Sequence, residues 1–558
     1  MEVKVAAVAS IVALVTGGVT GGVAPTPHEW QPEPATYGVS APTMTSVRMD
    51  DGVMISTEVV YPTDPATGAK ATGKFPVLLT QNPYGAGRSD PASGGAYFVQ
   101  RGYIYVASAV RGTGASGGQV DWFGARQGRD GANLVDWAAH VLPGSDGKVG
   151  LDGCSYLGVD QWFTAAAVGR NSALKAITPF CTDSNFYDDL TAYGGIPTTF
   201  VAGIAHAEPR GPEDDPATDP QSVTVAQQAS GGPRSYNNEY WQQLDVQKLL
   251  PTIVANGVPA LTEAGWQDLF PGGNLGAYVA AQNAYFHRPL TAPITAGEPT
   301  TGRYQAIVGP WTHGEHVNEA TLQGFRLEWF DTWLKGEHTG IADTRTPLHL
   351  FENTANRWVD TAAWPPSSTA RSFQFDTSGT LAWAPGNALT YTTQPLTGVL
   401  DGPSNLTVYA TSTTPEVELS ATLNVLKADG SVVKQADGIL LGSQRKLDAS
   451  QSWYGSGHTL LQPSHPFTQA SQQPVPVGQL TRYDIPLLAN FTALAPDDRL
   501  QVVLTSQPPA NLHLQTAPTP QERASLAGGV YTVKSASLNV PLTPDRFRTS
   551  PTNWGPSS

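Results

Sequence analysis

Residues 153–158 read GCSYLG and hold a serine, Ser155, in a glycine-bounded turn. A strand is predicted at 149–151 and a helix at 157–168, so the turn joins a strand to a helix, where a serine hydroxyl can stand above the edge of a sheet. The segment departs from the G-x-S-x-G pattern, because Leu157 occupies the second glycine position and the glycine follows one residue later. An ordinary Gly/Ser turn is the competing interpretation of this segment alone.

A serine hydroxyl becomes a useful nucleophile only beside a base, and the base needs a carboxylate that fixes its tautomer. Asp268 follows a strand predicted at 258–262, and His313 follows a strand predicted at 305–308. The carboxyl ends of parallel strands meet at one edge of a sheet. We therefore predict Ser155 as nucleophile, His313 as base and Asp268 as the orienting acid, in the chain order of the α/β-hydrolases.

Other residues compete for two of these roles. His316 lies three residues after His313, and Glu263 lies five residues before Asp268. Glu263 belongs to the predicted strand and His316 to the beginning of a helix, so His313 and Asp268 are preferred.

The oxyanion of a tetrahedral intermediate requires two hydrogen-bond donors. The backbone N–H of Tyr156, directly after the serine, is predicted to be one of them. The second is expected from the loop QNPYG at 81–85, which follows a strand predicted at 75–79 and carries the hydroxyl of Tyr84. A tyrosine that only packs over this loop is the alternative.

The elements that must position these residues alternate between short apolar runs and helical stretches. This alternation predicts a parallel sheet covered by helices on both faces, and hence an α/β fold. The predicted strands are 75–79, 103–107, 149–151, 174–177, 259–261 and 306–308, and the clearest helices are 130–140 and 157–168.

The pattern changes several times along the chain. Residues 45–62 predict a hairpin that turns at Asp51-Gly52. We expect the α/β core in two parts, 44–184 and 251–340, interrupted by a cap insertion at 185–250. From 341 to 558, short alternating segments between Gly, Pro, Asp and Asn predict a β-sandwich.

The N-terminal residues have the composition of an export signal. Residues 1–24 combine a weakly charged front, an apolar run and a small-residue stretch, and residues 25–43 have the composition of a linker. The apolar run is shorter than the roughly 20 residues of a membrane-spanning helix. We expect a secreted protein without a stable membrane span.

Length and charge limit the partners. A chain of 558 residues is too long for one core, and its net charge of −15 with only 32 Lys and Arg disfavours nucleic acid as a partner. The two cysteines, Cys154 and Cys181, are too few for a cysteine-ligated zinc site or a disulfide scaffold. Parallel strand ends could bring them together, so one disulfide and two buried thiols both remain open.

Several segments of the sequence resemble the superfamily that joins Xaa-Pro dipeptidyl-peptidases, bacterial cocaine esterase (CocE/NonD) and α-amino-acid ester hydrolases. The matching segments are NPY at 82–84, VRGTGASGG at 110–118, GCSYLG at 153–158 with QW at 161–162, GWQD at 265–268, GPWTH at 309–313, EWFDTWLKG at 328–336 and NRW at 356–358. The resemblance implies an α/β-hydrolase fold with a helical cap and a C-terminal jelly-roll domain. It also implies that the Tyr84 hydroxyl contacts the oxyanion. One departure is Ala109, where the family commonly has Asp, from which we expect altered local packing or pocket shape and intact chemistry.

These observations predict hydrolysis of a carboxylic ester or amide through an acyl-enzyme, without metal or cofactor. An Xaa-Pro dipeptidyl-peptidase is the alternative, and it would need a carboxylate near the cap for the substrate ammonium. Acidic cap residues are more often solvated, and the long N-terminal extension of the larger bacterial dipeptidyl-peptidases is not recognised, so an esterase is preferred. A carbohydrate-binding protein on an inactive hydrolase scaffold is a more distant alternative. The acids available in the cap are Asp188, Asp189, Glu213, Asp214 and Asp215.

Overall fold

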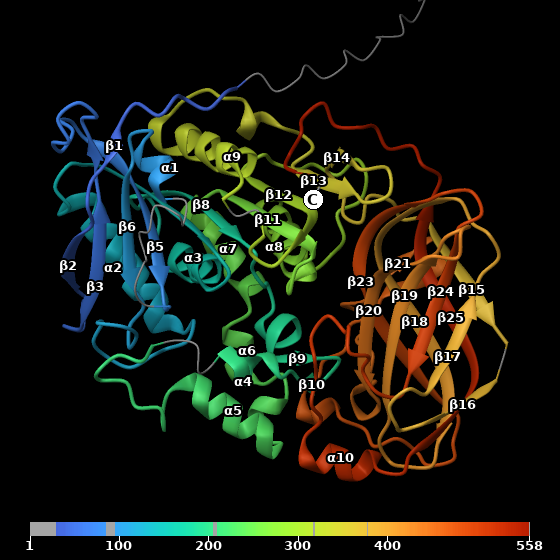
Figure 1. Ribbon diagram of the computed structural model, residues 1–558. Coiled ribbons are helices and arrows are strands. Elements are labelled where there is room, and N and C mark those ends of the chain that lie inside the picture. The colour runs from blue at the N-terminus through green and yellow to red at the C-terminus, as the bar shows by residue number, and fades with distance from the viewer. Residues whose placement is uncertain (1–29, 85–94, 205–208, 316–317, 377, 557–558) are drawn as a thin grey trace, which may run out of the picture.

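A computed structural model describes residues 30–84, 95–204, 209–315, 318–376 and 378–556. The chain forms an α/β part, a smaller helical insertion and a β-rich part that lies beside both (Figure 1). The predicted export signal at 1–24 falls outside the described residues.

A ten-stranded sheet forms the α/β part, in the order β14-β13-β12-β11-β8-β7-β5-β6-β3-β2. Every neighbouring pair from β6 to β13 is parallel, whereas β2, β3 and β14 run antiparallel to their neighbours. The bounds are β2 Thr43–Arg48, β3 Met54–Val60, β5 Phe75–Asn82, β6 Ile104–Ala109, β7 Ser145–Cys154, β8 Leu174–Phe180, β11 Ala260–Gln267, β12 Tyr304–Thr312, β13 Leu348–Glu352 and β14 Arg357–Thr361. Each predicted strand overlaps an observed one, and the predicted hairpin is β2 and β3.

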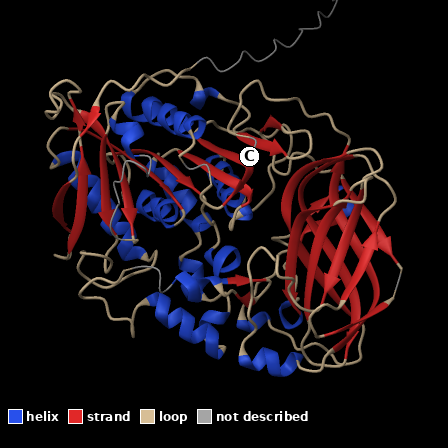
Figure 2. Ribbon diagram, viewed as in Figure 1, coloured by secondary structure: helices blue, strands red, loops and turns tan. Residues whose placement is uncertain are grey.

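Helices cover both faces of this sheet (Figure 2). One face packs on α1 and α9 through an aromatic core that contains Phe98, Trp329 and Phe330. The other packs mainly on α2, α3 and α7. The bounds are α1 Gly95–Val99, α2 Ala125–His140, α3 Tyr156–Ala167, α7 Val246–Asn256, α8 Pro271–Tyr285 and α9 Ala320–Phe330, with α9 continued by a π-helical turn at Asp331–Lys335. Within the described ranges, no helix is both long and apolar enough to cross a membrane.

The insertion between β8 and β11 consists of short elements, most of them helical. It contains a π-helical turn at Tyr187–Thr191, β9 Ala192–Tyr193, β10 Ile196–Pro197, α4 Phe200–Ile204, α5 Pro220–Ser230, a 3₁₀ turn at Pro233–Ser235 and α6 Glu239–Gln243, and it leads into α7. The Tyr193 hydroxyl donates to Asp437 of the β-rich part at 2.9 Å, which ties the insertion to that domain.

The β-rich part consists of two antiparallel sheets, a five-stranded one with β15, β16, β18, β23 and β25 and a four-stranded one in the order β17-β24-β19-β20. The bounds are β15 Ala370–Phe375, β16 Gly379–Ala382, β17 Ala388–Thr392, β18 Gly398–Ser412, β19 Glu418–Leu426, β20 Val432–Leu441, β23 Thr481–Leu494, β24 Arg499–Thr505 and β25 Val530–Thr543. Smaller elements are β21 Trp453–Gly455, β22 Thr459–Gln462 and α10 Pro520–Leu526.

Two expected boundaries need correction. The β-rich part was expected from residue 341, yet β13 and β14 extend the α/β sheet, because β13 pairs parallel with β12. The segment 25–43 was expected to be a linker. From residue 30 it packs on the α/β part instead: Tyr37 contacts Phe75 edge to face, and β1 (Gly38–Val39) pairs with β4 (Pro62–Thr63).

The last described residues return to the α/β part. Trp554 stacks on His349 with ring centroids 3.5 Å apart, and its indole N–H donates to Asp360 at 2.8 Å. The Trp358 indole N–H donates to the Gly555 carbonyl at 3.2 Å. The C-terminal segment is therefore part of the hydrolase core and not a free tail.

Trp554→Ala should lower the free energy of unfolding by about 3 kcal/mol, because it removes a large buried side chain and leaves a cavity against His349. Thermal unfolding followed by circular dichroism would measure this loss. Val477→Ala, at an exposed position of the β-rich part, is the control and should change stability by less than about 0.5 kcal/mol. Equal melting temperatures for the two variants would contradict the docking of the tail.

Candidate active site

Ser155 lies between β7 and α3 in a strained backbone conformation, with φ 61° and ψ −127°. Close packing of the two glycines around it explains the irregular motif. A Cβ atom on Gly153 would lie 2.6 Å from the Cβ atom of Leu157, and one on Gly158 would lie 2.5 Å from Thr182 Cγ2 and 2.8 Å from the Gly153 carbonyl. The contact that requires glycine is therefore at 158, so a larger residue is accepted at 157.

Ser155, His313 and Asp268 form one hydrogen-bonded chain. His313 Nε2 lies 2.9 Å from Ser155 Oγ, and His313 Nδ1 lies 2.9 Å from Asp268 Oδ1. Asp268 is buried, and its Oδ1 also accepts the Phe270 N–H at 3.0 Å. The His313 side chain is 26% exposed, so the serine–histidine pair is open to solvent while the acid is not.

The ends of β11 and β12 approach each other closely, and this brings Asp268 and His313 together. A Cβ atom on Gly265 would lie 1.9 Å from the Trp311 carbonyl oxygen, so only glycine fits there. The Asp268 N–H donates a hydrogen bond back to the Gly265 carbonyl at 3.1 Å. The GWQD segment is thus a tight turn that presents its acid to the next strand end.

The competing residues have other positions. Glu263 lies within β11 and pairs with Arg326 at 3.5 Å. Burial raises the pKa of Glu263 to about 7, an effect that the Arg326 guanidinium opposes. His316 lies outside the described residues.

The two predicted oxyanion donors are neighbours. Tyr156 is the first residue of α3, so its N–H lies at the positive end of that helix. Tyr84 follows β5, its N–H donates to Asn82 Oδ1 at 2.8 Å, and its ring packs edge to face on the Tyr156 ring, with centroids 6.3 Å apart. The loop residues after Tyr84, from 85 to 94, lie outside the described ranges.

An aromatic support beside the serine was not found from the sequence. Trp122 and Phe123 both have positive φ values, 35° and 63°, and Phe123 lies against Tyr156 with ring centroids 4.0 Å apart. Gln127 Oε1 accepts both the Phe123 N–H at 2.8 Å and the Tyr156 hydroxyl at 3.0 Å. No periodic pattern marks these residues, and only the aromatic pair inside a Gly-rich segment could have drawn attention to them.

Cys154 and Cys181 are free thiols. The hydrogen bond with the Cys154 thiol, together with burial, raises the pKa of Cys181 well above its ordinary value. The backbone of Gly314, in the turn that carries His313, acts in the opposite direction and lowers this pKa.

Comparison with known proteins identifies the family. Residues 51–315 match the model of the X-Pro dipeptidyl-peptidases (S15 family), and residues 383–524 match the C-terminal non-catalytic domain of these peptidases. The chain belongs to the superfamily of X-Pro dipeptidyl-peptidases and CocE/NonD hydrolases.

Relatives of this CocE/NonD-type chain include both curated and solved proteins. Cocaine esterase of Rhodococcus sp. (strain MB1 Bresler) is 27% identical over 394 residues, which are 60% of this chain and 61% of that enzyme. The chain thus matches less than two thirds of the length of that relative. A CocE/NonD hydrolase from Staphylococcus aureus superposes with a TM-score of 0.69 at 19% identity, covering 90% of this chain and 93% of the other. An α-amino acid ester hydrolase superposes with a TM-score of 0.65 at 18% identity, covering 94% and 100%.

The departure from the family at Ala109 has a local explanation. Ala109 is buried and has no carboxylate, and the nearby Arg111 pairs with carboxylates of other residues. It forms a bidentate pair with Asp130 at 2.6 and 2.8 Å and a further pair with Asp51 at 2.9 Å. This CocE/NonD-type chain therefore fixes Arg111 through α2 and the β2–β3 turn.

Gly158→Ala should destabilise the serine turn, because the new methyl group would overlap Thr182 and the Gly153 carbonyl. We expect loss of about 1–3 kcal/mol of stability and a weaker reaction of Ser155 with an active-site probe. Gly203→Ala in α4 is the matched control, since a Cβ atom there meets nothing within 4 Å and alanine favours a helix. Calorimetry and probe labelling would test both, and a Gly158→Ala protein as stable as Gly203→Ala would refute this account of the motif.

Proposed function

We propose that this chain is a serine esterase or acyl hydrolase that cleaves a carboxylic ester or amide through an acyl-enzyme. The observation that carries the proposal is the continuous hydrogen-bonded chain from Ser155 through His313 to Asp268, with both links at 2.9 Å. Membership of a hydrolase superfamily supports it independently.

In the proposed mechanism, neutral His313 keeps its Nδ1 proton, donates a hydrogen bond through it to Asp268, and accepts the Ser155 proton at Nε2. Ser155 Oγ then attacks the substrate carbonyl carbon, and His313 returns the proton to the leaving group. A water molecule repeats the sequence on the acyl-enzyme. Because Asp268 is buried and bonded to the Phe270 N–H, it can hold the imidazole in this tautomer throughout.

The negative charge on the substrate oxygen would be stabilised by the Tyr156 N–H and the Tyr84 hydroxyl. The N-terminus of α3 adds a favourable dipole at this position. Gln127 and Phe123 act through Tyr156: they fix its side chain and thereby the first turn of the helix.

A dipeptidyl-peptidase is the second candidate, because the matching family model bears that name. Such an enzyme needs a carboxylate for the substrate ammonium, and three cap acids are already engaged. Glu213 accepts the Gly118 N–H at 2.6 Å, Asp214 accepts the Val120 N–H at 3.0 Å, and Asp215 accepts the Ala217 N–H at 3.0 Å.

The remaining two acids are engaged as well. Asp189 Oδ2 accepts the N–H groups of Ser184 and Asn185, each at 2.9 Å. Asp188 accepts from the Asn185 side chain at 3.0 Å. Burial, together with the nearby Asp189 and Asp245 carboxylates, raises the pKa of Asp188 to about 8, so it is mainly neutral at pH 7. These engagements favour the esterase.

The function is tested with a fluorophosphonate probe and paired substrates. The wild type should be labelled and should hydrolyse p-nitrophenyl esters, whereas Ser155→Ala should lose both properties. Asp268→Asn should lower kcat by about 10⁴-fold, and Tyr84→Phe by about 10²–10³-fold. An unlabelled wild type would refute the proposal. Faster cleavage of Gly-Pro-p-nitroanilide than of the esters would establish the peptidase instead.

Asp188→Asn should stabilise the protein increasingly as the pH rises from 4 to 9. The raised pKa means that the folded state binds the Asp188 proton more tightly than the unfolded chain does. In the wild type, the contribution of Asp188 to stability is therefore complete below pH 4 and is lost as the pH rises through 8. Melting temperatures across this range would measure the difference. Asp64→Asn is the control, and its effect on stability should change with pH in the opposite direction, because backbone N–H groups lower the pKa of that exposed acid. A constant difference between Asp188→Asn and wild type would contradict a buried neutral carboxyl.

We further propose that the chain is exported, which rests on the composition of residues 1–24. Expression of the full chain in a secreting host should release protein whose N-terminus lies beyond the apolar run. Retention of intact residues 1–24 in the cell would refute it.

A further inference from the structure

Three metal-binding side chains meet at the buried side of the proposed triad. One ligand atom each from Cys181, Asp268 and His313 lies within 4.8 Å of the other two. These residues stand at the ends of the neighbouring strands β8, β11 and β12, so the sheet itself holds them together. Cys154, at the end of β7, lies beside Cys181 but is not part of this group.

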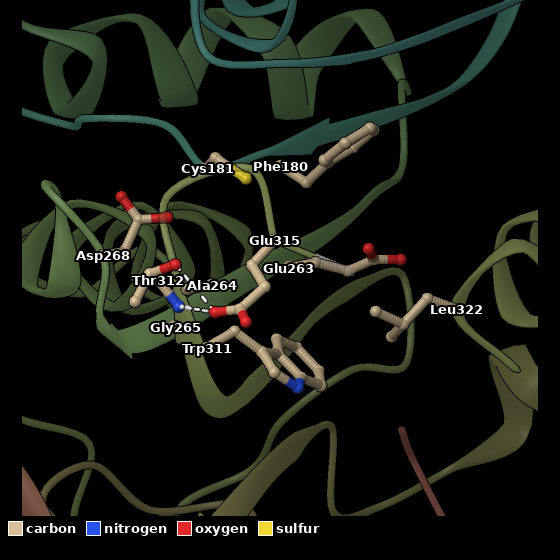
Figure 3. Close-up of a pocket in the computed structure, with 10 residues that line it drawn as sticks. All are labelled: Phe180, Cys181, Glu263, Ala264, Gly265, Asp268, Trp311, Thr312, Glu315 and Leu322. Carbon is tan, nitrogen blue, oxygen red and sulfur yellow. Dashed lines mark hydrogen bonds between the residues drawn. The ribbon is translucent and has the colours of Figure 1, made fainter. Parts of the chain in front are cut away.

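A small cavity borders part of this group (Figure 3). Its volume is about 10 Å³, close to that of one water-sized sphere, and its walls include Cys181 and Asp268. Glu263 and Glu315 also line it, and Glu315 together with the ionised fraction of Glu263 adds negative charge around the space. The Arg326 guanidinium offsets part of that charge through its pair with Glu263, while Glu315 is bonded to the Thr312 N–H and hydroxyl.

One oxygen of the Asp268 carboxylate has no hydrogen-bond partner among the residues that the structure describes. Asp268 is fully buried and uses Oδ1 for His313 and Phe270, but its Oδ2 makes no hydrogen bond to any residue that the structure describes. A buried carboxylate oxygen without a partner is costly. A cation bound here would satisfy it.

We propose that Cys181, Asp268 and His313 bind a soft divalent cation such as Zn²⁺, with a water molecule as fourth ligand, and that this cation inhibits the hydrolase. Thiolate, imidazole and carboxylate are the ligands that Zn²⁺ takes in tetrahedral sites. On binding, the Cys181 thiol releases its proton to water, and a sulfur electron pair forms the bond to the metal. One cysteine is enough in this mixed set, because Asp268 and His313 supply the other protein ligands.

Inhibition follows from the shared histidine. Coordination through Nδ1 would replace the proton that orients the ring toward Asp268, and coordination through Nε2 would prevent the ring from accepting the Ser155 proton. In either case His313 no longer serves as a base. The inhibitory effect rests on the proposed function, whereas the binding of the metal does not.

The binding arm uses reduced full-length protein carrying Ser155→Ala and the probe Cd²⁺, whose bonds to thiolates give an ultraviolet charge-transfer absorption. We expect saturation at one Cd²⁺ per chain. His313→Ala and Cys181→Ser, each added to that background, should weaken Cd²⁺ binding by about 10–100-fold or more. Loss of a residue that merely orients a metal ligand already weakens binding by about that much. Absence of the absorption, or His313→Ala binding as tightly as its parent, would overturn the mixed site. His313→Ala keeps both thiols, so it also decides the matter if Cys181→Ser does not fold.

The inhibition arm measures ester hydrolysis by the wild type with Zn²⁺. Activity should fall as Zn²⁺ is added and should return with a chelator, while Mg²⁺ at the same concentration should have no effect. Cys181→Ser, compared with its own metal-free rate, should need at least about tenfold more Zn²⁺ for half inhibition. A wild type that binds one Cd²⁺ but keeps full activity with saturating Zn²⁺ would overturn the inhibition. A wild type with no hydrolysis at all refutes the proposed function and leaves the binding arm to decide the site.

Discussion

The candidate site depends on one constraint, which is the register of the parallel strand ends. Ser155, Asp268 and His313 come from β7, β11 and β12, and two hydrogen bonds of 2.9 Å join them only if these strands end at the same level. Gly265 allows β11 and β12 to approach, and Gly158 allows α3 to start directly after the serine. The close contacts at Gly153 and Gly158 hold the serine in its strained backbone conformation.

The second and third parts of the chain support the same constraint from outside. His513 of the β-rich part contacts the Leu269 carbonyl, next to Asp268, and burial lowers the pKa of this histidine, so that it is neutral near pH 7. The insertion reaches the same domain through Tyr193 and Asp437. The turn that carries the acid is thus held by the sheet on one side and by the β-rich part on the other.

Much of the fold and the candidate triad could be predicted from the sequence, because both depend on local signals. Apolar runs mark the buried strands, and polar residues just after them mark the strand ends at 155, 268 and 313. The polar ends of the strands were not predicted. In β7, for example, the strand begins at Ser145, but only its apolar centre was predicted as a strand. Features that depend on distant contacts could not be predicted. Phe123 packs on Tyr156, a residue distant in the sequence. The short strands β13 and β14 can be assigned to the α/β part only once the pairing of β13 with β12 is known.

The docking of Trp554 on His349 has a consequence for how the chain is made. Strands synthesised in the first two thirds of the protein receive part of their covering from its last described residues. Contacts between positions so far apart in sequence slow folding, because a long loop must close first. On the ribosome, the edge of the sheet around β13 and β14 would therefore stay partly uncovered until the whole β-rich part has been translated.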